Sequence, residues 1–483
     1  MTKTASNTLA TQRLREELAY LKLPPAAWPT QGQSVDGEEL ADVAIVGAGM
    51  FGIAAAVALI LRGVQNIRLF DDQPQGHSGP WTTYARMPTL RSPKDLPGLA
   101  LGIRALTFRA WYEAVHGDEA WEALYKIPNA VWQGYLDWIA EAFDLPIEYQ
   151  APIRSFSVAP GQVTLWRADG GTFKARRLVI ASGRAGAGGA SIPAFVDPGL
   201  FPRFAAHSCD PVDFSALVGR HVAVIGAGSS AWDNAATALE HGAAHVTLYA
   251  RRSHLPQINK ARGYVYPGFI EGWSALAPEQ KWAVSCYLDD TPPPPPHETV
   301  LRTLAAAGGE RLSVNFDSRF EAVSEVDGRV QLQLGERSDQ ADFLIVGTGF
   351  RVDLARAPLF GHVLERVALW RDRFTPATER PHLGLFPWLG RGFELEERGR
   401  ADGDSELNQV HLFNHAASLS FGSIASDIPA ISAAAERLAQ GIVTQLFCAD
   451  FSAYQQRLLD WEQEWELEKT PYFHPHRGRQ DLP

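Results

Sequence analysis

A glycine-rich turn near the start of the chain has the spacing needed to hold a diphosphate. Gly47, Gly49 and Gly52 form a G-x-G-x-x-G pattern between an apolar run at residues 43–46 and a predicted helix. The first glycine permits a tight turn, the second lets the backbone approach a pyrophosphate, and the third lets helix and strand pack closely. The N-terminus of that helix faces the phosphate charge. The turn, with Phe51 inside it, is therefore predicted to bind a dinucleotide.

A second turn of the same kind follows a later apolar strand. Gly226, Gly228 and Ala231 give G-x-G-x-x-A, with Ser229 and Ser230 at the start of the next predicted helix. The same physical requirements apply to this turn, and an alanine is small enough to serve at the third position. Two such turns in one chain predict two dinucleotide sites.

The ends of the two following strands distinguish these sites. The strand at residues 67–70 ends at Asp71, whose carboxylate is expected to accept a hydrogen bond from a ribose hydroxyl, with Asp72 as the adjacent alternative. After the second turn, the corresponding strand leads to Arg251 and Arg252 instead. A carboxylate would repel a 2′-phosphate, whereas guanidinium groups form charge-assisted hydrogen bonds with it. The second site is predicted to prefer NADPH to NADH, and a solvated basic turn is the alternative interpretation of the arginines.

Alternating elements are expected to position both turns. Apolar strands and predicted helices alternate from residue 42 onward, which is typical of a parallel sheet. Residues 8–22 have leucines at helical spacing and predict an amphipathic helix ahead of the first sheet. A helical region at 100–150 contains four tryptophans, interpreted as an aromatic core with the lining of a substrate tunnel as the alternative: Trp111, Trp121, Trp132 and Trp138.

Composition limits the classes of partner. The 483 residues carry a net charge of −11, and without a basic stripe to neutralise phosphates no nucleic-acid partner is expected. Residues 1–10 lack the pattern of a signal peptide, and no apolar stretch approaches the roughly 18 residues that span a bilayer, so a cytoplasmic enzyme without a membrane partner is expected. Cys209, Cys286 and Cys448 form no C-x-x-C pair, which excludes a dithiol centre of that type and a cysteine metal cluster.

With several further motifs, the two turns resemble the class B flavin-dependent monooxygenases across residues 40–355. Gly79, Pro80 and Trp81 stand where the family often has a G-x-W element near the flavin, and Ser230 and Asp233 match the G-x-G-x-S-A-x-D form of its NADPH turn. Three segments match other family patterns: residues 178–183 its A-T-G strand, residues 192–195 its I-P-x-F stretch, and residues 342–350 its second A-T-G-F strand.

The sequence departs from this family just before the second turn. The signature F-x-G-x-x-x-H-x-x-x-aromatic keeps Phe201 and His207, but Arg203 replaces its glycine and Pro211 its aromatic residue. Residues 86–96 are similar to a flavin-side segment of the N-hydroxylating enzymes. This combination points away from the Baeyer–Villiger and ordinary flavin-containing subgroups, and leaves the N-hydroxylating side or a branch of its own.

The resemblance implies an α/β fold with two Rossmann-like dinucleotide-binding domains, the NADPH domain being inserted into the FAD domain. The expected boundaries are an N-terminal helical extension at 1–40, the first part of the FAD domain at 41–210, the NADPH domain at 211–345, and the second part of the FAD domain with the C-terminal region at 346–483.

The resemblance also implies the activity. NADPH reduces FAD, the reduced flavin and O₂ form a C4a-(hydro)peroxyflavin, and one oxygen passes to a small organic substrate, with N-hydroxylation or another heteroatom oxygenation favoured. Baeyer–Villiger oxidation of a ketone and an NADPH-dependent flavoprotein reductase without a dithiol are the alternatives, and a homo-oligomer is left open.

Few catalytic side chains are expected, because the cofactors supply the difficult chemistry. Four residues are candidates near the reacting centre: His207, Asn259, Lys260 and Asn414. The residues predicted to bind the cofactors are Gly47, Gly49, Phe51, Gly52, Asp71, Trp81, Arg91, Gly183, Gly226, Gly228, Ser229, Ser230, Arg251, Arg252 and Gly349. No metal ligand is predicted.

Overall fold

The computed structural model describes residues 3–33, 37, 39–403, 405–425, 428–461 and 465–474. Its strands are β1 (Gly32–Gln33), β2 (Glu39–Val46), β3 (Ile67–Phe70), β4 (Ile147–Glu148), β5 (Ile153–Ala159), β6 (Gln162–Arg167), β7 (Thr172–Ile180), β8 (Ala205–His207), β9 (His221–Ile225), β10 (His245–Tyr249), β11 (Leu312–Asn315), β12 (Ala322–Val326), β13 (Arg329–Leu334), β14 (Arg337–Ala341), β15 (Phe343–Val346) and β16 (Val410–Leu412). Its α-helices are α1 (Lys3–Leu21), α2 (Met50–Ile60), α3 (Phe108–His116), α4 (Asp118–Ala123), α5 (Asn129–Ala142), α6 (Ser229–Glu240), α7 (Pro267–Gly272), α8 (Pro278–Asp290), α9 (His297–Ala307), α10 (Trp370–Arg373), α11 (Ser418–Phe421), α12 (Ile431–Ala449) and α13 (Phe451–Leu459).

The first sheet contains the strand that leads into the first glycine turn. Its order is β4-β3-β2-β7-β6-β5, with β1 beside β2 and β16 beside β7. Strands β4, β3, β2, β7 and β16 run parallel, so their carboxyl ends meet at one edge, where the glycine turn leaves β2. Val43, Ala44 and Ile45 of β2 are fully buried, as expected of a parallel strand covered on both faces.

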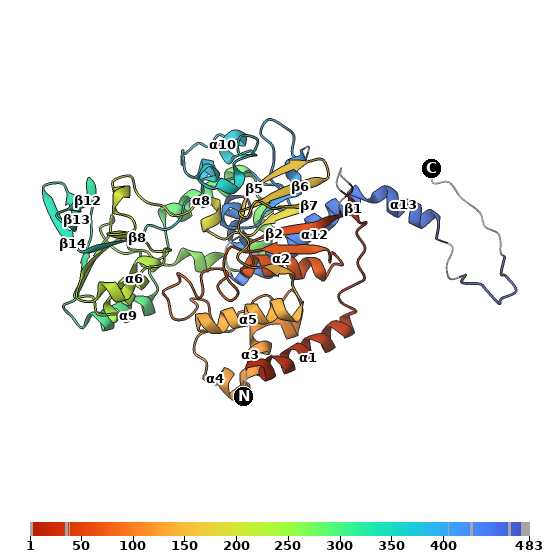
Figure 1. The fold of residues 1–483 in the computed structure, drawn as a ribbon, viewed down its shortest axis with the longest axis horizontal. Helices are drawn as coiled ribbons and strands as arrows, with labels where there is room; N and C mark the ends of the chain where they lie inside the picture. Colours follow the sequence, from red (N-terminus) through yellow and green to blue (C-terminus); the bar gives the residue numbers. More distant parts are fainter. Residues whose placement is uncertain are drawn as a thin grey trace.

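The second sheet repeats this arrangement around the second glycine turn. All its strands are parallel in the order β11-β10-β9-β15-β8, and α6 and α9 pack against each other beside it (Figure 1). An antiparallel meander of β12, β13 and β14 lies next to this sheet. Strand β8 belongs to the second sheet although it precedes the predicted boundary at residue 211, because its three residues pair with β15.

The chain returns to the first sheet after β15. Strand β16 adds to β7 in parallel, pairing Val410 with Leu178. Helix α12 then packs on α2, the helix that follows the first glycine turn. Helix α13 extends away from the body, at the right of Figure 1. Segments that precede and follow the second sheet in the sequence therefore both contribute strands to the first sheet.

The tryptophan-rich region is a helical core below the first sheet. Trp111, Trp121, Trp132 and Trp138 are all buried, which confirms the interpretation as an aromatic core. The predicted N-terminal helix is α1, and it packs on α3. Its Thr11 hydroxyl accepts a hydrogen bond from the Trp138 indole at 3.0 Å.

Candidate active site

The first glycine turn combines close packing with open space. Gly47 has a φ of +100°, and a Cβ there would lie 2.6 Å from the Ala181 carbonyl oxygen. A Cβ on Gly52 would overlap the Gly47 carbonyl oxygen, so this glycine is required for the helix to approach the turn. A Cβ on Gly49 would meet nothing closer than 3.8 Å. The backbone beside Gly49 is therefore open at the N-terminus of α2, as the approach of a pyrophosphate requires, and the contact itself stays a prediction.

Asp71 binds the turn itself. Its carboxylate accepts hydrogen bonds from the backbone N–H groups of Ala48 at 2.7 Å and Gln73 at 2.8 Å. Burial raises the pKa of Asp71, against the effect of these two donors. Asp72 is exposed and lies beside it. Asp71 therefore shapes the turn at the strand end, and its contact with a ribose, or that of Asp72, stays a prediction.

The second glycine turn has the same geometry. Gly226 has a φ of +120°, and a Cβ on Gly226 would overlap the Gly347 carbonyl oxygen. A Cβ on Gly228 would meet nothing within 4 Å, which again leaves space at a helix N-terminus. Ala231 is fully buried against Gly347, since a Cβ on that glycine would lie 2.8 Å from the Ala231 methyl. The alanine of G-x-G-x-x-A is therefore the packing position of this turn.

Two arginines follow the strand next to the second turn. Arg251 and Arg252 are exposed directly after β10, and neither forms an ion pair within the described residues. The backbone around them is fixed by hydrogen bonds from Asp317 N to Arg252 O and from Ser318 N to Ala250 O. Guanidinium groups form charge-assisted hydrogen bonds with a 2′-phosphate, and the assignment of Arg251 and Arg252 to this role stays a prediction.

His207 lies at the carboxyl end of β8, the edge strand of the second sheet. Its Nδ1 is 2.9 Å from the Cys209 sulfur and accepts from the Cys209 N–H at 3.3 Å, which assigns the proton to Nε2. Burial lowers the pKa of His207, while Asp210 and the Gly349 backbone act in the opposite direction. Burial raises the pKa of Cys209 to about 11. The pair is therefore a neutral imidazole and a thiol.

Asn414 lies at the carboxyl end of β16, beside the end of β7. Its Nδ2 is 3.4 Å from the Ser182 hydroxyl, and its Oδ1 accepts from Ala416 N at 3.0 Å. The next residue, His415, has a pKa lowered to about 3 by burial and by Arg184. His415 Nδ1 is buried and has no hydrogen-bond partner in the described part of the chain. Such an atom needs a partner, which a bound cofactor or substrate would supply.

Trp81 also has a buried polar atom without a hydrogen-bond partner in the described part of the chain. Its indole Nε1 is buried without a partner among the described residues, while its ring packs edge-on against Trp132 at 6.2 Å. Phe51 packs edge-on against Phe413, the residue before Asn414, at 4.9 Å. These contacts pack the first glycine turn and the Trp81 segment against neighbouring aromatic side chains. The unpartnered indole N–H is suited to donate a hydrogen bond to a polar ring system.

Asn259 and Lys260 lie on a segment that returns from the second sheet. Asn259 Oδ1 accepts from Ala261 N at 3.0 Å, and Lys260 is exposed. Further along, the buried Trp273 donates from its indole to Leu419 O at 3.2 Å. Leu419 is five residues beyond Asn414, so this anchor holds the segment against the part of the first sheet that carries Asn414.

Two other residues predicted to bind a cofactor, Arg91 and Gly183, lie outside the two glycine turns. Arg91 forms an ion pair with Asp233 of α6, with Nη2 and Oδ2 2.7 Å apart, and its predicted cofactor contact stays a prediction. Gly183 has a φ of +65° and is exposed after β7. Two residues at the site carried no motif, Arg184 and His415. The only sequence signal for them was their place directly after Gly183 and Asn414.

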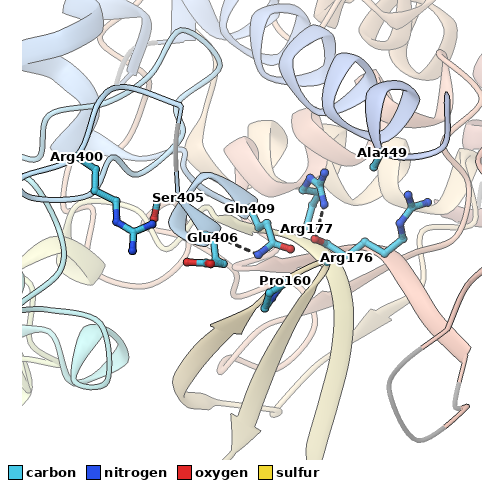
Figure 2. Close-up of a pocket in the computed structure, with 9 residues that line it drawn as sticks. Pro160, Arg176, Arg177, Arg400, Ser405, Glu406, Gln409 and Ala449 are labelled. Atoms are coloured by element: carbon cyan, nitrogen blue, oxygen red, sulfur yellow. Dashed lines mark hydrogen bonds between the residues drawn. The ribbon is translucent and has the colours of Figure 1, made fainter. Parts of the chain in front are cut away.

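A pocket of about 390 Å³ lies beside the turn between β5 and β6, apart from the predicted site residues (Figure 2). It is lined by Arg176, Arg177, Gln409 and residues of the β5–β6 turn, and by none of the predicted site residues. Arg176 is engaged by Asp42 at 3.3 Å and Asp450 at 2.5 Å. Its guanidinium is therefore occupied in holding α12 and β2 together.

Comparison with known proteins decides the family. The FAD-dependent urate hydroxylase of Xanthomonas campestris pv. campestris is 35% identical over 426 residues, which cover 87% of this chain and 89% of the relative. The chain belongs to the class B flavin-dependent monooxygenases. The profile described as pyridine nucleotide-disulphide oxidoreductase matches residues 44–271 of this monooxygenase. Its three cysteines are all free, so it has no disulfide of the kind in that description.

Solved structures agree with the monooxygenase fold. The FAD-bound cadaverine monooxygenase of the desferrioxamine pathway from Erwinia amylovora has a TM-score of 0.65 at 15% identity, covering 84% of this chain and 95% of the other. The ornithine N-hydroxylase of Kutzneria sp. 744, solved with reduced FAD, NADP⁺ and L-ornithine, has 0.65 at 16%, covering 84% and 99%. These likenesses confirm the fold class of two dinucleotide-binding units.

Family membership confirms the predicted enzyme class. The protein is an FAD- and NADPH-dependent monooxygenase that uses O₂ and a small-molecule substrate. The backbone beside Gly49 and Gly228 is open at the two helix N-termini, as a bound pyrophosphate requires, and the buried nitrogens of Trp81 and His415 lack a partner within the described residues. The described residues contain no helix long and apolar enough to cross a membrane.

Proposed function

We propose that this monooxygenase hydroxylates urate or a closely related anionic nitrogen heterocycle. The observation that carries the proposal is the 35% identity to the urate hydroxylase over nearly the full length of both chains. The solved enzymes named for cadaverine and ornithine are only 15% and 16% identical, so they support the fold and not an amine substrate.

Exposed cations that follow β7 and β10 support an anionic substrate. Arg184 is exposed, forms no ion pair within the described residues, and is close enough to His415 to lower its pKa. Residues 251–263 contain four cationic side chains and no acidic one, in a chain of net charge −11. We assign Arg251 and Arg252 to the 2′-phosphate of NADPH, and we propose that the remaining cations attract an anionic substrate.

A cationic amine would meet repulsion there. Lys260 and Arg262 of the returning segment are both exposed, and neither forms an ion pair in the described part of the chain. Asp210, the acidic residue beside His207, is already engaged, since its carboxylate accepts from His207 N at 2.7 Å. Electrostatic complementarity therefore favours urate over ornithine, lysine or cadaverine.

The cofactors supply electron transfer and oxygen activation, and the chain supplies binding and orientation. The overall balance is NADPH, H⁺, O₂ and urate giving NADP⁺, water and hydroxylated urate. We assign the two glycine turns to the pyrophosphates and Arg184 to the substrate oxyanion. The neutral imidazoles of His207 and His415 can offer hydrogen bonds without adding charge.

We also propose the division of the chain and its setting. Residues 41–210 and 346–483 would form the FAD domain and residues 211–345 the NADPH domain, with β8 assigned to the latter; the pairing of β16 with β7 supports this. Three free cysteines are compatible with the reducing cytoplasm, and a small-molecule enzyme without a nucleic-acid partner fits the acidic charge. A homo-oligomer stays open.

The proposal is tested by substrate-stimulated NADPH consumption under air. Urate should accelerate NADPH oxidation and lower the hydrogen peroxide formed per NADPH, because oxygen then leaves in product and water. Ornithine, lysine and cadaverine should do neither. Stimulation by an amine, with urate inert, would refute the substrate class while leaving the enzyme class intact.

Arg184→Met should raise the KM for urate about tenfold, the loss expected for one charge-assisted hydrogen bond, with a smaller change in kcat. Arg184→Lys should recover part of the loss. The KM for NADPH should stay within about twofold, because the contact assigned to Arg184 is with the substrate and not with the coenzyme. Arg154→Met, which removes an exposed cation from the edge strand β5, is the matched control. An unchanged KM for urate in Arg184→Met would exclude the assigned contact.

A further inference from the structure

The two dinucleotide-binding units are joined by a hydrogen-bonded ion pair. Asp233 on α6 is 2% exposed, and its Oδ2 lies 2.7 Å from Nη2 of Arg91, in the segment between β3 and β4 of the first sheet. The other carboxylate oxygen accepts from the Thr299 hydroxyl at 3.1 Å and lies 3.8 Å from Arg302. A buried carboxylate of the second unit thus depends on a cation from the first.

Further contacts tie the same surfaces together. Glu298 on α9 accepts from Lys126 at 2.5 Å and from the Tyr125 hydroxyl at 2.7 Å. Arg302 of α9 donates to Arg86 O at 2.9 Å, and Arg86 donates to Asp210 O at 3.1 Å. These contacts from the first unit come from residues 86–126. A second set joins the units elsewhere, including the hydrogen bond from Trp273 to Leu419 O and the ion pair between Arg380 and Asp290.

The ion pair lies between the two cofactor-binding elements. Asp233 is one helical turn beyond Ser229, which starts α6 at the second glycine turn. Arg91 is ten residues after Trp81, whose indole nitrogen lacks a partner. A shift of α6 relative to the Arg91 segment would change the separation of the two cofactor spaces.

We propose that Arg91 and Asp233 are positioning residues for hydride transfer. Their ion pair holds the NADPH-binding helix at the distance where a hydride passes from NADPH to FAD, which oxidises the first and reduces the second. The two residues act through the position of α6 and not through contact with the nicotinamide, so the pair sets the rate of transfer and not the affinity for NADPH. The proposal requires no particular substrate to be oxygenated.

Anaerobic flavin reduction by NADPH, followed by flavin absorbance, tests this. Arg91→Met should lower the limiting reduction rate about three- to tenfold, because small misplacements of reacting groups are costly. The NADPH concentration for half-maximal rate should stay within about twofold, since the glycine turn and the strand-end arginines are intact. Arg91→Lys should recover most of the rate, and reduction by dithionite should be unchanged in all variants.

Controls separate positioning from folding. Asp233→Asn with Arg91→Met should be no slower than the slower single variant, because both remove one interaction. Arg329→Met is the matched control, because it breaks an ion pair with Asp342 that lies entirely within the second unit. The side chains of Arg329 and Arg91 are both 42% exposed, and Arg329→Met should leave the reduction rate unchanged. A normal limiting rate in flavin-replete Arg91→Met, or losses that multiply in the double variant, would overturn the proposal. Reduced flavin content or slowed dithionite reduction in Arg91→Lys would also overturn it.

Discussion

Gly52→Ala is expected to yield protein without bound FAD. The added methyl would overlap the Gly47 carbonyl oxygen, which belongs to the turn that faces the pyrophosphate. Overpacking of this kind costs about 1–3 kcal/mol, and it falls directly on the turn geometry, so FAD affinity should drop about 100-fold. The measurement is the flavin-to-protein absorbance ratio of the purified variant and the Kd for added FAD.

Gly49→Ala should give the same loss of flavin by a different route. Its methyl would meet no protein atom closer than 3.8 Å, so the turn should keep its shape and the methyl should occupy cofactor space. Gly272→Ala, where a Cβ meets nothing within 4 Å, is the matched control and should stay fully yellow. Full flavin content in either turn variant would contradict the assignment of this turn.

Arg251→Ala is expected to remove most of the preference for NADPH. A 2′-phosphate carries about two negative charges, and each charge-assisted hydrogen bond contributes about 1.5–3 kcal/mol, so kcat/KM for NADPH should fall 10- to 100-fold. The value for NADH should hardly change, because NADH has no phosphate to lose. We favour Arg251 over Arg252 because it takes the position of the missing acid.

The check is a steady-state comparison of both coenzymes in the two arginine variants. Arg220→Ala removes an exposed arginine just before β9, at the opposite end of the second sheet, and should affect neither coenzyme. Equal losses for NADPH and NADH in Arg251→Ala would show a structural role for this arginine instead.

Local patterns predicted most of the fold. The strands at residues 67–70, 221–225 and 245–249 could be predicted because short apolar runs and glycine turns are contiguous in sequence. The assignment of β8 to the second sheet could not, since three residues carry too little pattern to choose a partner. Its pairing depends on β15, which lies far along the chain.

The site was predictable only where backbone geometry dictates residue type. Glycine at positions 47 and 52 follows from φ and close packing, so its spacing was visible in the sequence. Arg91 was expected at the flavin, but its partner Asp233 lies 142 residues away, and no local pattern encodes such a pair. His415 carried no motif, since its role follows from burial that only the assembled fold creates.

Isotope labelling of the product tests the central claim that this chain is a monooxygenase. The purified protein would be supplied with FAD, NADPH, urate and ¹⁸O₂, and the product mass measured before any spontaneous decay. A monooxygenase should give one ¹⁸O atom per product molecule, one labelled water, and one NADPH consumed. Product oxygen derived only from solvent, or complete conversion of O₂ to hydrogen peroxide with every urate-like substrate and amine tried, would contradict it.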